Sequence, residues 1–225
     1  MTWSPRSFEH DGFAVVDAVV PPDECDAVAD GLGAGIDAVG SRGILRHRPC
    51  VALIDRLRGH PVVGRSFLRD SVAVQCTWFE KSSSRNWLVP MHQDLSIPVA
   101  ERLDHPALRG WACKEGVHFV QPPVEVLEQL VAVRLHLDRC AIDDGPLRVV
   151  PGSHRRGRLA SHEAAALRRA RGDEPCLVAA GDALVLRPLL LHASSKSTTA
   201  CRRRVLHFLF GPTTLPFGLR WADAH

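Results

Sequence analysis

The spacing of apolar and polar side chains divides the chain into a helical first part and a strand-rich second part. Residues 13–16 predict a strand, and Pro21 to Glu24 predict the start of a helix that continues to about Val39. Three glycines weaken that helix, and a further short helix is predicted over residues 61–68. From about residue 71 the spacing of apolar residues becomes typical of β-strands. Strands are predicted over 72–79, 130–138, 147–150, 183–187 and 205–210.

One more helix is predicted inside the strand-rich part. It covers residues 161–171, with Ser161 as its N-cap and Gly172 as its stop. Asp-Gly-Pro, Pro-Gly-Ser and Gly-Asp turn signals separate the strands. Many short strands after an N-terminal helical region predict a mainly β fold with flanking α-helices, either a sandwich or a jelly-roll barrel with helices packed on one face.

The length of the chain, 225 residues, suits a single domain. We expect an N-terminal helical elaboration over about 1–70 and a jelly-roll core over about 71–215. The stretch 96–123 lies between two strand regions and shows no regular pattern. Loops of that length in compact domains are often lids over a functional site. A mobile insertion is the alternative.

Composition narrows the class of protein. The net charge is only +3, aromatic residues make up 6% and tyrosine is absent, which argues against nucleic-acid binding. No apolar run approaches the roughly 18 residues of a membrane span, and no signal peptide is visible. The seven cysteines form no Cys-x-x-Cys pair, so we expect a cytoplasmic protein with reduced thiols. Lys81, one of only three lysines, is expected to be solvated.

A candidate metal site starts from His92 and Asp94. On a strand, residues i and i+2 point to the same face, so an imidazole and a carboxylate can reach one point. His192, which follows an apolar run, can supply a third ligand. Two histidines and one carboxylate on one face of an octahedron leave three positions open, as in Fe(II) sites that use O2. Taken alone, His-x-Asp is a weak signal, because a surface pair is commoner than a pair of ligands.

An arginine and a hydroxyl follow the third candidate ligand. Arg203 comes eleven residues after His192, and Ser194 comes two residues after it. A guanidinium at that position can bind the distal carboxylate of a dicarboxylate as a bidentate ion pair. The Ser194 hydroxyl can donate to the same carboxylate. The triad, the basic anchor after it and the jelly-roll pattern together indicate one type of site.

Four segments, in the same order, resemble the phytanoyl-CoA dioxygenase family of Fe(II)/2-oxoglutarate-dependent oxygenases. They are residues 8–32, 86–94 (NWLVPMHQD), 144–154 (DGPLRVVPGSH) and 181–207. The resemblance implies a double-stranded β-helix and a dioxygenase that uses Fe(II), 2-oxoglutarate and O2. It also implies release of succinate and CO2 as an unactivated C–H bond of a small molecule is hydroxylated. The implied iron ligands are His92, Asp94 and His192, and Arg203 and Ser194 are the implied anchors of 2-oxoglutarate.

One position departs from the family pattern and another bears on the reaction type. Met91 stands before the first ligand, where such proteins often have an aromatic residue. Asp94 is present, whereas related halogenases have a small residue there that frees a site for halide. The resemblance therefore favours hydroxylation or another two-electron oxidation.

Other residues are candidates for the pocket. We expect Arg134, on the polar face of a central strand, to bind a carboxylate of substrate or cosubstrate; an internal salt bridge to Asp138 or Glu80 is the alternative. Trp87 and Gln93 flank the strand that carries His92 and are candidate pocket residues, although packing in the core is the commoner role for a tryptophan such as Trp87. Gln121 is a candidate residue of the lid.

Two other functions are compatible with these residues. A cupin-type metal-dependent oxygenase that does not use 2-oxoglutarate would keep the triad without needing Arg203. A catalytically silent ligand-binding module could also have this fold, because a fold does not guarantee activity. The sequence does not identify the small-molecule substrate, which could be a CoA thioester, an amino acid or a natural-product intermediate. It leaves the oligomeric state open as well.

Overall fold

Alternating side chains give the main sheet of the protein two different faces. The computed structural model describes residues 5–32, 40–200 and 202–225. In the central strand, Val133 and Leu135 point into one apolar core, and Arg134 and His136 point to the opposite face. The sheet is antiparallel, with the strands in the order β1 (Phe13–Val16), β10 (Ala183–Leu186), β7 (Val131–His136), β12 (Arg203–Gly211) and β2 (Val72–Lys81).

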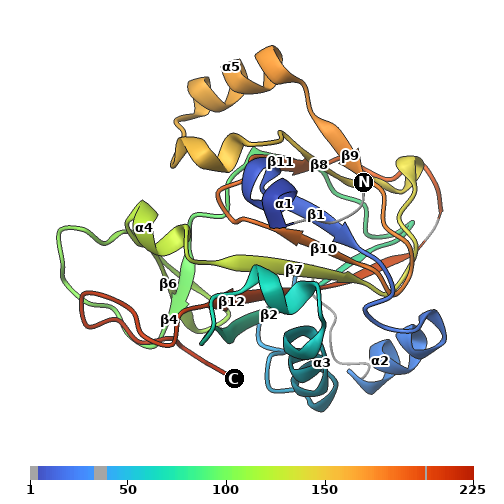
Figure 1. Cartoon of the computed structure of the whole chain (residues 1–225), viewed down its shortest axis with the longest axis horizontal. Coiled ribbons are helices and arrows are strands. Elements are labelled where there is room, and N and C mark those ends of the chain that lie inside the picture. The colour runs from blue at the N-terminus through green and yellow to red at the C-terminus, as the bar shows by residue number, and fades with distance from the viewer. Residues whose placement is uncertain (1–4, 33–39, 201) are drawn as a thin grey trace.

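The N-terminal helices cover the apolar face of this sheet. Buried residues of α2 (Cys25–Gly31) and α3 (Arg48–Gly59), such as Cys25 and Leu57, pack with Leu206 and Phe208 of β12 in one core. Figure 1 shows α2 and α3 together on one side of the main sheet. The helices of this part are α1 (Pro5–Asp11), α2 (Cys25–Gly31) and α3 (Arg48–Gly59), with the 3-10 helices η1 (Pro22–Glu24) and η2 (Val63–Ser66).

A second antiparallel sheet faces the other side of the main sheet. Its Leu147 and Val149 pack with Ala132, Leu184 and Leu209 of the main sheet in a second apolar core. The two facing sheets form the expected double-stranded β-helix. The strands of the second sheet are, in order, β3 (Val89–His92), β11 (His192–Ser194), β8 (Leu147–Val149) and β9 (Glu174–Cys176). The remaining helices are α4 (Val124–Leu127), α5 (Ser161–Arg171), η3 (Ile142–Asp144) and η4 (Ser153–Arg156).

The sequence suggested that the stretch 96–123 is irregular, but in the structure it contains strands. It forms a third antiparallel sheet in the order β4 (Ile97–Val99), β6 (Val117–Gln121) and β5 (Arg109–Lys114). The polar residues between its short strands hide the alternation, and β5 is largely exposed on both faces. A small sheet that is anchored through Val99 and Val120 in the second core is better ordered than a loop.

All five strands predicted after residue 71 are confirmed, as β2, β7, β8, β10 and β12. The strand predicted over residues 13–16 is β1. The helix predicted from Pro21 begins as a 3-10 turn and ends at Gly31; its predicted continuation over 33–39 lies outside the described residues. Ser161 is the first helical residue of α5 rather than its N-cap, which is Ala160. The helix predicted over 61–68 is only the 3-10 turn η2.

The helix α3 was not predicted, although its sequence carried the signal. Cys50, Leu53, Ile54 and Leu57 follow the i, i+3, i+4, i+7 spacing of an amphipathic helix and are all buried. Among the described residues, no helix has the length and apolar character needed to cross a membrane.

Candidate active site

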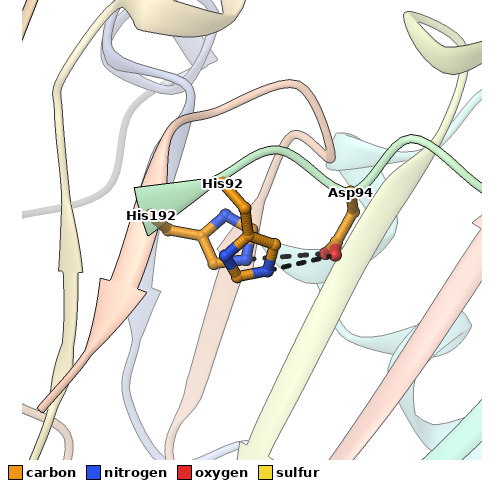
Figure 2. A group of neighbouring side chains, drawn as sticks. All are labelled: His92, Asp94 and His192. Carbon is orange, nitrogen blue, oxygen red and sulfur yellow. Dashed lines mark ion pairs between the residues drawn. The ribbon is translucent and has the colours of Figure 1, made fainter. Parts of the chain in front are cut away.

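His92, Asp94 and His192 come together at one edge of the second sheet. His92 ends β3 and His192 begins β11, and the two are directly opposite each other in the antiparallel register. Asp94 follows β3, where its backbone N–H donates to the Pro188 carbonyl at 2.9 Å. Figure 2 shows both imidazoles turned toward the Asp94 carboxylate, with Nε2–O distances of 3.6 Å from His92 and 3.7 Å from His192. The sequence-predicted triad is therefore one cluster in space.

Hydrogen bonds to the backbone fix the orientation of both imidazole rings. His92 Nδ1 lies 2.8 Å from the Pro90 carbonyl oxygen, and His192 Nδ1 lies 2.8 Å from that of Leu190. Because a carbonyl oxygen can only accept, each Nδ1 carries the hydrogen and each Nε2 keeps a free lone pair. Metal-binding histidines are commonly held this way by a second hydrogen bond.

The electrostatic state of the cluster also suits a cation. Burial raises the pKa of Asp94, but the neighbouring His192 and then His92 outweigh it, so the pKa lies well below the usual range. Burial lowers the pKa of His192 to about 4. Burial acts in the same direction on His92, but the adjacent Asp94 carboxylate favours its protonated form and raises its pKa overall. A charged carboxylate beside a neutral imidazole is the state that a divalent metal needs.

The three side chains fit an Fe(II) ion. Their ligand atoms all lie within 4.8 Å of one another. Ligands about 2.1 Å from one ion and at right angles would lie about 3 Å apart, so a small closing movement would bring them into range. Two nitrogens and one carboxylate oxygen are the donor set of the Fe(II) facial triad, which leaves three positions for other ligands.

A cavity of about 460 Å³ opens in front of this cluster. That volume is within the range of small-molecule sites. A larger hollow of about 790 Å³ lies elsewhere, lined by residues such as Val15, His60 and Leu177, but none of the three candidate ligands lines it. We place the active site in the smaller cavity because the metal cluster and most of the sequence-predicted pocket residues line it.

Arg203 and Ser194 meet at the Gly145 carbonyl. Arg203 Nη1 donates to that oxygen at 2.6 Å, and the Ser194 hydroxyl donates to it at 3.0 Å. Gly145 has φ +65°, and a Cβ there would lie 2.4 Å from the Ser195 carbonyl oxygen, so only glycine fits this close turn. Both Arg203 and Ser194 are buried and line the cavity, as candidate anchors of a cosubstrate must.

Lys81 is a residue of this site that the sequence reading missed. It was expected to be solvated, but it is only 1% exposed and lines the cavity. Its Nζ donates to the Ser194 hydroxyl at 2.8 Å and to the Ser195 carbonyl at 2.5 Å. Burial, and then the charge of Arg203, lower its pKa to about 8. The available signal was its place in β2, where every second residue from Gln75 onward faces the cavity.

Arg134 lines the same cavity without the salt bridge that was its alternative role. Its Nη1 lies 3.0 Å from His207 Nδ1. Asp138 is bound instead by Arg204 at 2.7 Å, and Glu80 by Arg202 at 2.8 Å. In the part of the chain that the structure describes, no carboxylate lies within ion-pair distance of Arg134.

The remaining predicted pocket residues all line the cavity. Trp87 is half-buried, outside both apolar cores, and its ring centroid lies 5.4 Å from Lys81 Nζ. The Gln93 amide donates to the Gly157 and Leu189 carbonyls, both at 2.7 Å, and accepts from the Leu159 N–H. Because its amide is engaged in these hydrogen bonds, Gln93 fixes the segment between His92 and Asp94 to the neighbouring backbone. Gln121 reaches the cavity from β6 of the third sheet.

The sequence profile of the family described as Phytanoyl-CoA dioxygenase (PhyH) matches residues 8–205. The chain belongs to the phytanoyl-CoA dioxygenase family. Members of this family are Fe(II)/2-oxoglutarate-dependent oxygenases, and the chain is an enzyme of this class. No curated protein sequence matches it.

Solved structures share the fold of this phytanoyl-CoA dioxygenase family member at low sequence identity. The apo form of EctD from S. alaskensis is 18% identical with a TM-score of 0.67, over 99% of this chain and 84% of EctD. The carbocyclase SnoK from nogalamycin biosynthesis is 16% identical with a TM-score of 0.65, over 92% and 82% of the two chains. HygX from Streptomyces hygroscopicus, solved with nickel and 2-oxoglutarate, is 19% identical with a TM-score of 0.61, over 95% and 89%.

Proposed function

We propose that this enzyme hydroxylates an unactivated C–H bond of a small molecule, with Fe(II) held by His92, Asp94 and His192. In balanced form, the substrate C–H, O2 and 2-oxoglutarate give the C–OH product, succinate and CO2. When bound, the metal and 2-oxoglutarate supply O2 activation and the oxidising power. One observation carries the proposal: two Nε2 atoms and one carboxylate converge on a cavity that is also lined by the buried cations Lys81 and Arg203.

The chain's own residues would orient the cosubstrate. Arg203, Lys81 and Ser194 offer a guanidinium, an ammonium and a hydroxyl at one end of the cavity, where they can take the C5 carboxylate of 2-oxoglutarate. Trp87 covers the Lys81 ammonium and limits water there. The backbone hydrogen bonds of His92 and His192 hold both Nε2 atoms ready for the metal.

The third sheet would act as the lid expected over residues 96–123. Phe119 and Gln121 of β6, together with Lys114 of β5, line the cavity. Closure of such a cover over bound substrate would exclude water from the reaction.

The first test is an anaerobic titration of the apo-protein with Fe(II) and 2-oxoglutarate, followed through the weak visible charge-transfer band of the chelate. We expect a saturable band. Asp94→Ala should weaken Fe(II) binding by at least about 100-fold, since loss of an outer-shell partner alone costs 10–100-fold. Asp104→Ala, at an exposed site, is the matched control. Unchanged iron affinity in Asp94→Ala would contradict the assignment of Asp94.

The same titration separates this function from its rivals. In Arg203→Ala the iron should still bind. The 2-oxoglutarate concentration that gives half of the maximum band intensity should rise by about 100-fold, because a buried charge-assisted pair is lost. Arg202→Ala, at the neighbouring and more exposed arginine, should leave the band unchanged. Iron binding without any band would favour a cupin-type oxygenase that does not use 2-oxoglutarate. Absence of iron binding would favour a silent module.

The free thiols of the cysteines are consistent with a reducing compartment. The six cysteines within the described ranges are free, including Cys50 and Cys76, whose sulfur atoms lie 3.7 Å apart in the core. Unpaired buried thiols are typical of cytosolic proteins. This supports a cytoplasmic location, which fractionation of cells that produce the protein would test.

A further inference from the structure

Arg134 is a cation on the cavity wall whose donors are largely unused. It stands on β7, the middle strand of the main sheet, and is 9% exposed. Its Nη1 contacts His207 at 3.0 Å, its guanidinium lies 5.3 Å from the Phe79 ring centroid, and its buried Nε has no acceptor among the described residues. A guanidinium carries five N–H donors, and burying such a charge without a counter-ion is unfavourable. An anionic ligand would remove that cost.

The cavity as a whole has a surplus of positive charge. Among the described side chains that line it, Asp94 is the one carboxylate, and it is a candidate metal ligand. The cationic side chains that line the cavity are Arg42, Lys81, Lys114, Arg134 and Arg203. Arg42 is paired with Glu115 at 3.1 Å.

The cosubstrate does not account for all of these cations. This step rests on the proposed function, in which Lys81 and Arg203 take the C5 carboxylate of 2-oxoglutarate; the C1 carboxylate would then be the end of the cosubstrate held at His92, Asp94 and His192. Lys81 and Arg203 are linked through Ser194 and Gly145. Among the described residues, Arg134 makes no hydrogen bond to any of these; its hydrogen bond is to His207, and its guanidinium lies over the Phe79 ring. It is therefore left facing the cavity after both charges of the cosubstrate are placed.

Two neighbours of Arg134 add neutral hydrogen-bond donors. Because an arginine only donates, His207 Nδ1 must accept from Arg134, and the ring hydrogen is on Nε2. Burial, and then the charge of Arg134, lower the pKa of His207 to about 3, so the ring is neutral. Thr77 is the register partner of His207 on β2, and both line the cavity. A guanidinium, an imidazole N–H and a hydroxyl on one wall suit a carboxylate.

We propose that Arg134, with His207 and Thr77, binds a carboxylate of the primary substrate, so that this enzyme acts on small carboxylate-bearing molecules. The metal ligands belong to the second sheet and its edge, and Arg134 belongs to the inner face of the main sheet. A substrate anchored at Arg134 would thus span the cavity, with its reacting carbon toward the metal.

The test compares a carboxylate with a neutral molecule of the same shape. Benzoate and benzamide are titrated into the protein loaded with Zn(II), which keeps the complex diamagnetic, and saturating 2-oxoglutarate, with binding followed by ligand-observed NMR. We expect benzoate to bind about tenfold more tightly than benzamide, the effect of one charge-assisted hydrogen bond. Arg134→Gln should reduce this preference to about twofold or less. Arg134→Lys should keep most of it, and Arg42→Gln, which removes a cation already paired with Glu115, should keep all of it.

Several outcomes overturn the inference and leave the proposed function intact. These are equal or absent binding of the two probes, a preference that survives in Arg134→Gln, and a preference that disappears when 2-oxoglutarate is doubled, which would place benzoate in the cosubstrate site. A further one is a loss of 2-oxoglutarate affinity in Arg134→Gln that exceeds the loss for benzoate, since Arg134 would then serve the cosubstrate. If the wild-type protein forms no 2-oxoglutarate complex, the proposed function fails, and this inference fails with it.

Discussion

Two neighbouring arginines of β12 point to opposite faces of the main sheet and have opposite surroundings. Arg204 faces the helices, where its Nε and Nη2 donate to both oxygens of Asp138 at 2.8 and 2.7 Å, and Nη2 also reaches Asp26 at 2.6 Å. Arg203 faces the cavity, where its Nη1 has only the Gly145 carbonyl and the Cys140 sulfur, and its Nε has no acceptor among the described residues. Both are almost fully buried, at 6% and 4% exposed.

This difference separates Arg204, a charge that stabilises the fold, from the cations of the cavity, which are available to bind a ligand. On the helix-covered face the fold itself supplies a bidentate carboxylate, which raises the pKa of Arg204 through its hydrogen bond to Asp138. On the cavity face Lys81 and Arg134, like Arg203, have no carboxylate partner among the described residues, and burial is the main cause that lowers the pKa of Lys81 and of Arg134. Buried cations without carboxylates are unfavourable in the empty protein; a dianionic cosubstrate would relieve Lys81 and Arg203, and a carboxylate of the substrate would relieve Arg134.

The largest expected effect sharpens this comparison through stability. Arg204→Met should lower the free energy of unfolding by about 2 to 3 kcal/mol, because it leaves the Asp138 carboxylate without its bidentate partner. For a domain of this size, that corresponds to a fall in Tm of roughly 4 to 10 °C. Thermal unfolding of the ligand-free protein measures it, and 2-oxoglutarate affinity should not change.

The matched variant is Arg203→Met, one residue earlier. It removes a buried charge that has no carboxylate partner, so the Tm of the ligand-free protein should change by less than about 2 °C. Equal destabilisation by the two variants would erase the distinction between the two faces of the sheet.

Much of the fold follows from the periodicity of the sequence. The central strands alternate in period 2, so the pattern around Arg134 predicts both the strand β7 and the two faces that Val133 and Arg134 occupy. His92 and Asp94 are local enough for their common direction to be predicted from spacing. His192 needed the family resemblance, because 100 residues separate it from His92 and only the β3–β11 pairing brings them together.

Lys81 shows why the rest could not be predicted. A lysine at the end of a strand usually projects into solvent; its alternation with Gln75 and Thr77 indicates which face it shares, but not that this face is enclosed. Its burial depends on the pairing of β2 with β12 and on Ser194 at the end of β11, 113 residues away in the chain. The third sheet and the salt bridge of Asp138 to Arg204 are likewise set by contacts between distant segments. Such partner choices are tertiary, and single-residue preferences do not encode them.

A smaller effect concerns pH. The pKa of Lys81 is about 8 in the empty protein against an ordinary 10.5, so the ammonium is charged below pH 8 and is lost above it. If it binds the cosubstrate, the Kd of 2-oxoglutarate in the Ni(II)-loaded protein should rise by about tenfold between pH 7 and pH 9. Isothermal titration calorimetry at fixed ionic strength would measure this.

Two variants assign that pH dependence to Lys81 rather than to its charged or titratable neighbours Arg203, Arg134 and Cys140. Lys81→Met should bind 2-oxoglutarate weakly and with little change over the same pH range. Lys81→Arg should keep its affinity at pH 9, because a guanidinium stays charged. A wild-type pH step that persists in Lys81→Met would show that another group is responsible.

Apart from the Arg203→Met control, the smallest expected effect has the opposite sign to that of Arg204→Met. Burial, and then the charge of Arg203, lower the pKa of Arg134 to about 10, so the empty fold disfavours its charged form. Arg134→Met keeps a long apolar side chain against Phe79 and removes that charge, although it also loses the contact with His207. We expect the Tm of the ligand-free protein to rise by about 2 to 4 °C, equivalent to about 1 kcal/mol. A fall in Tm as large as that of Arg204→Met would instead make Arg134 part of what holds the sheet together, and the contrast between the two faces would then rest on Arg203 and Lys81 alone.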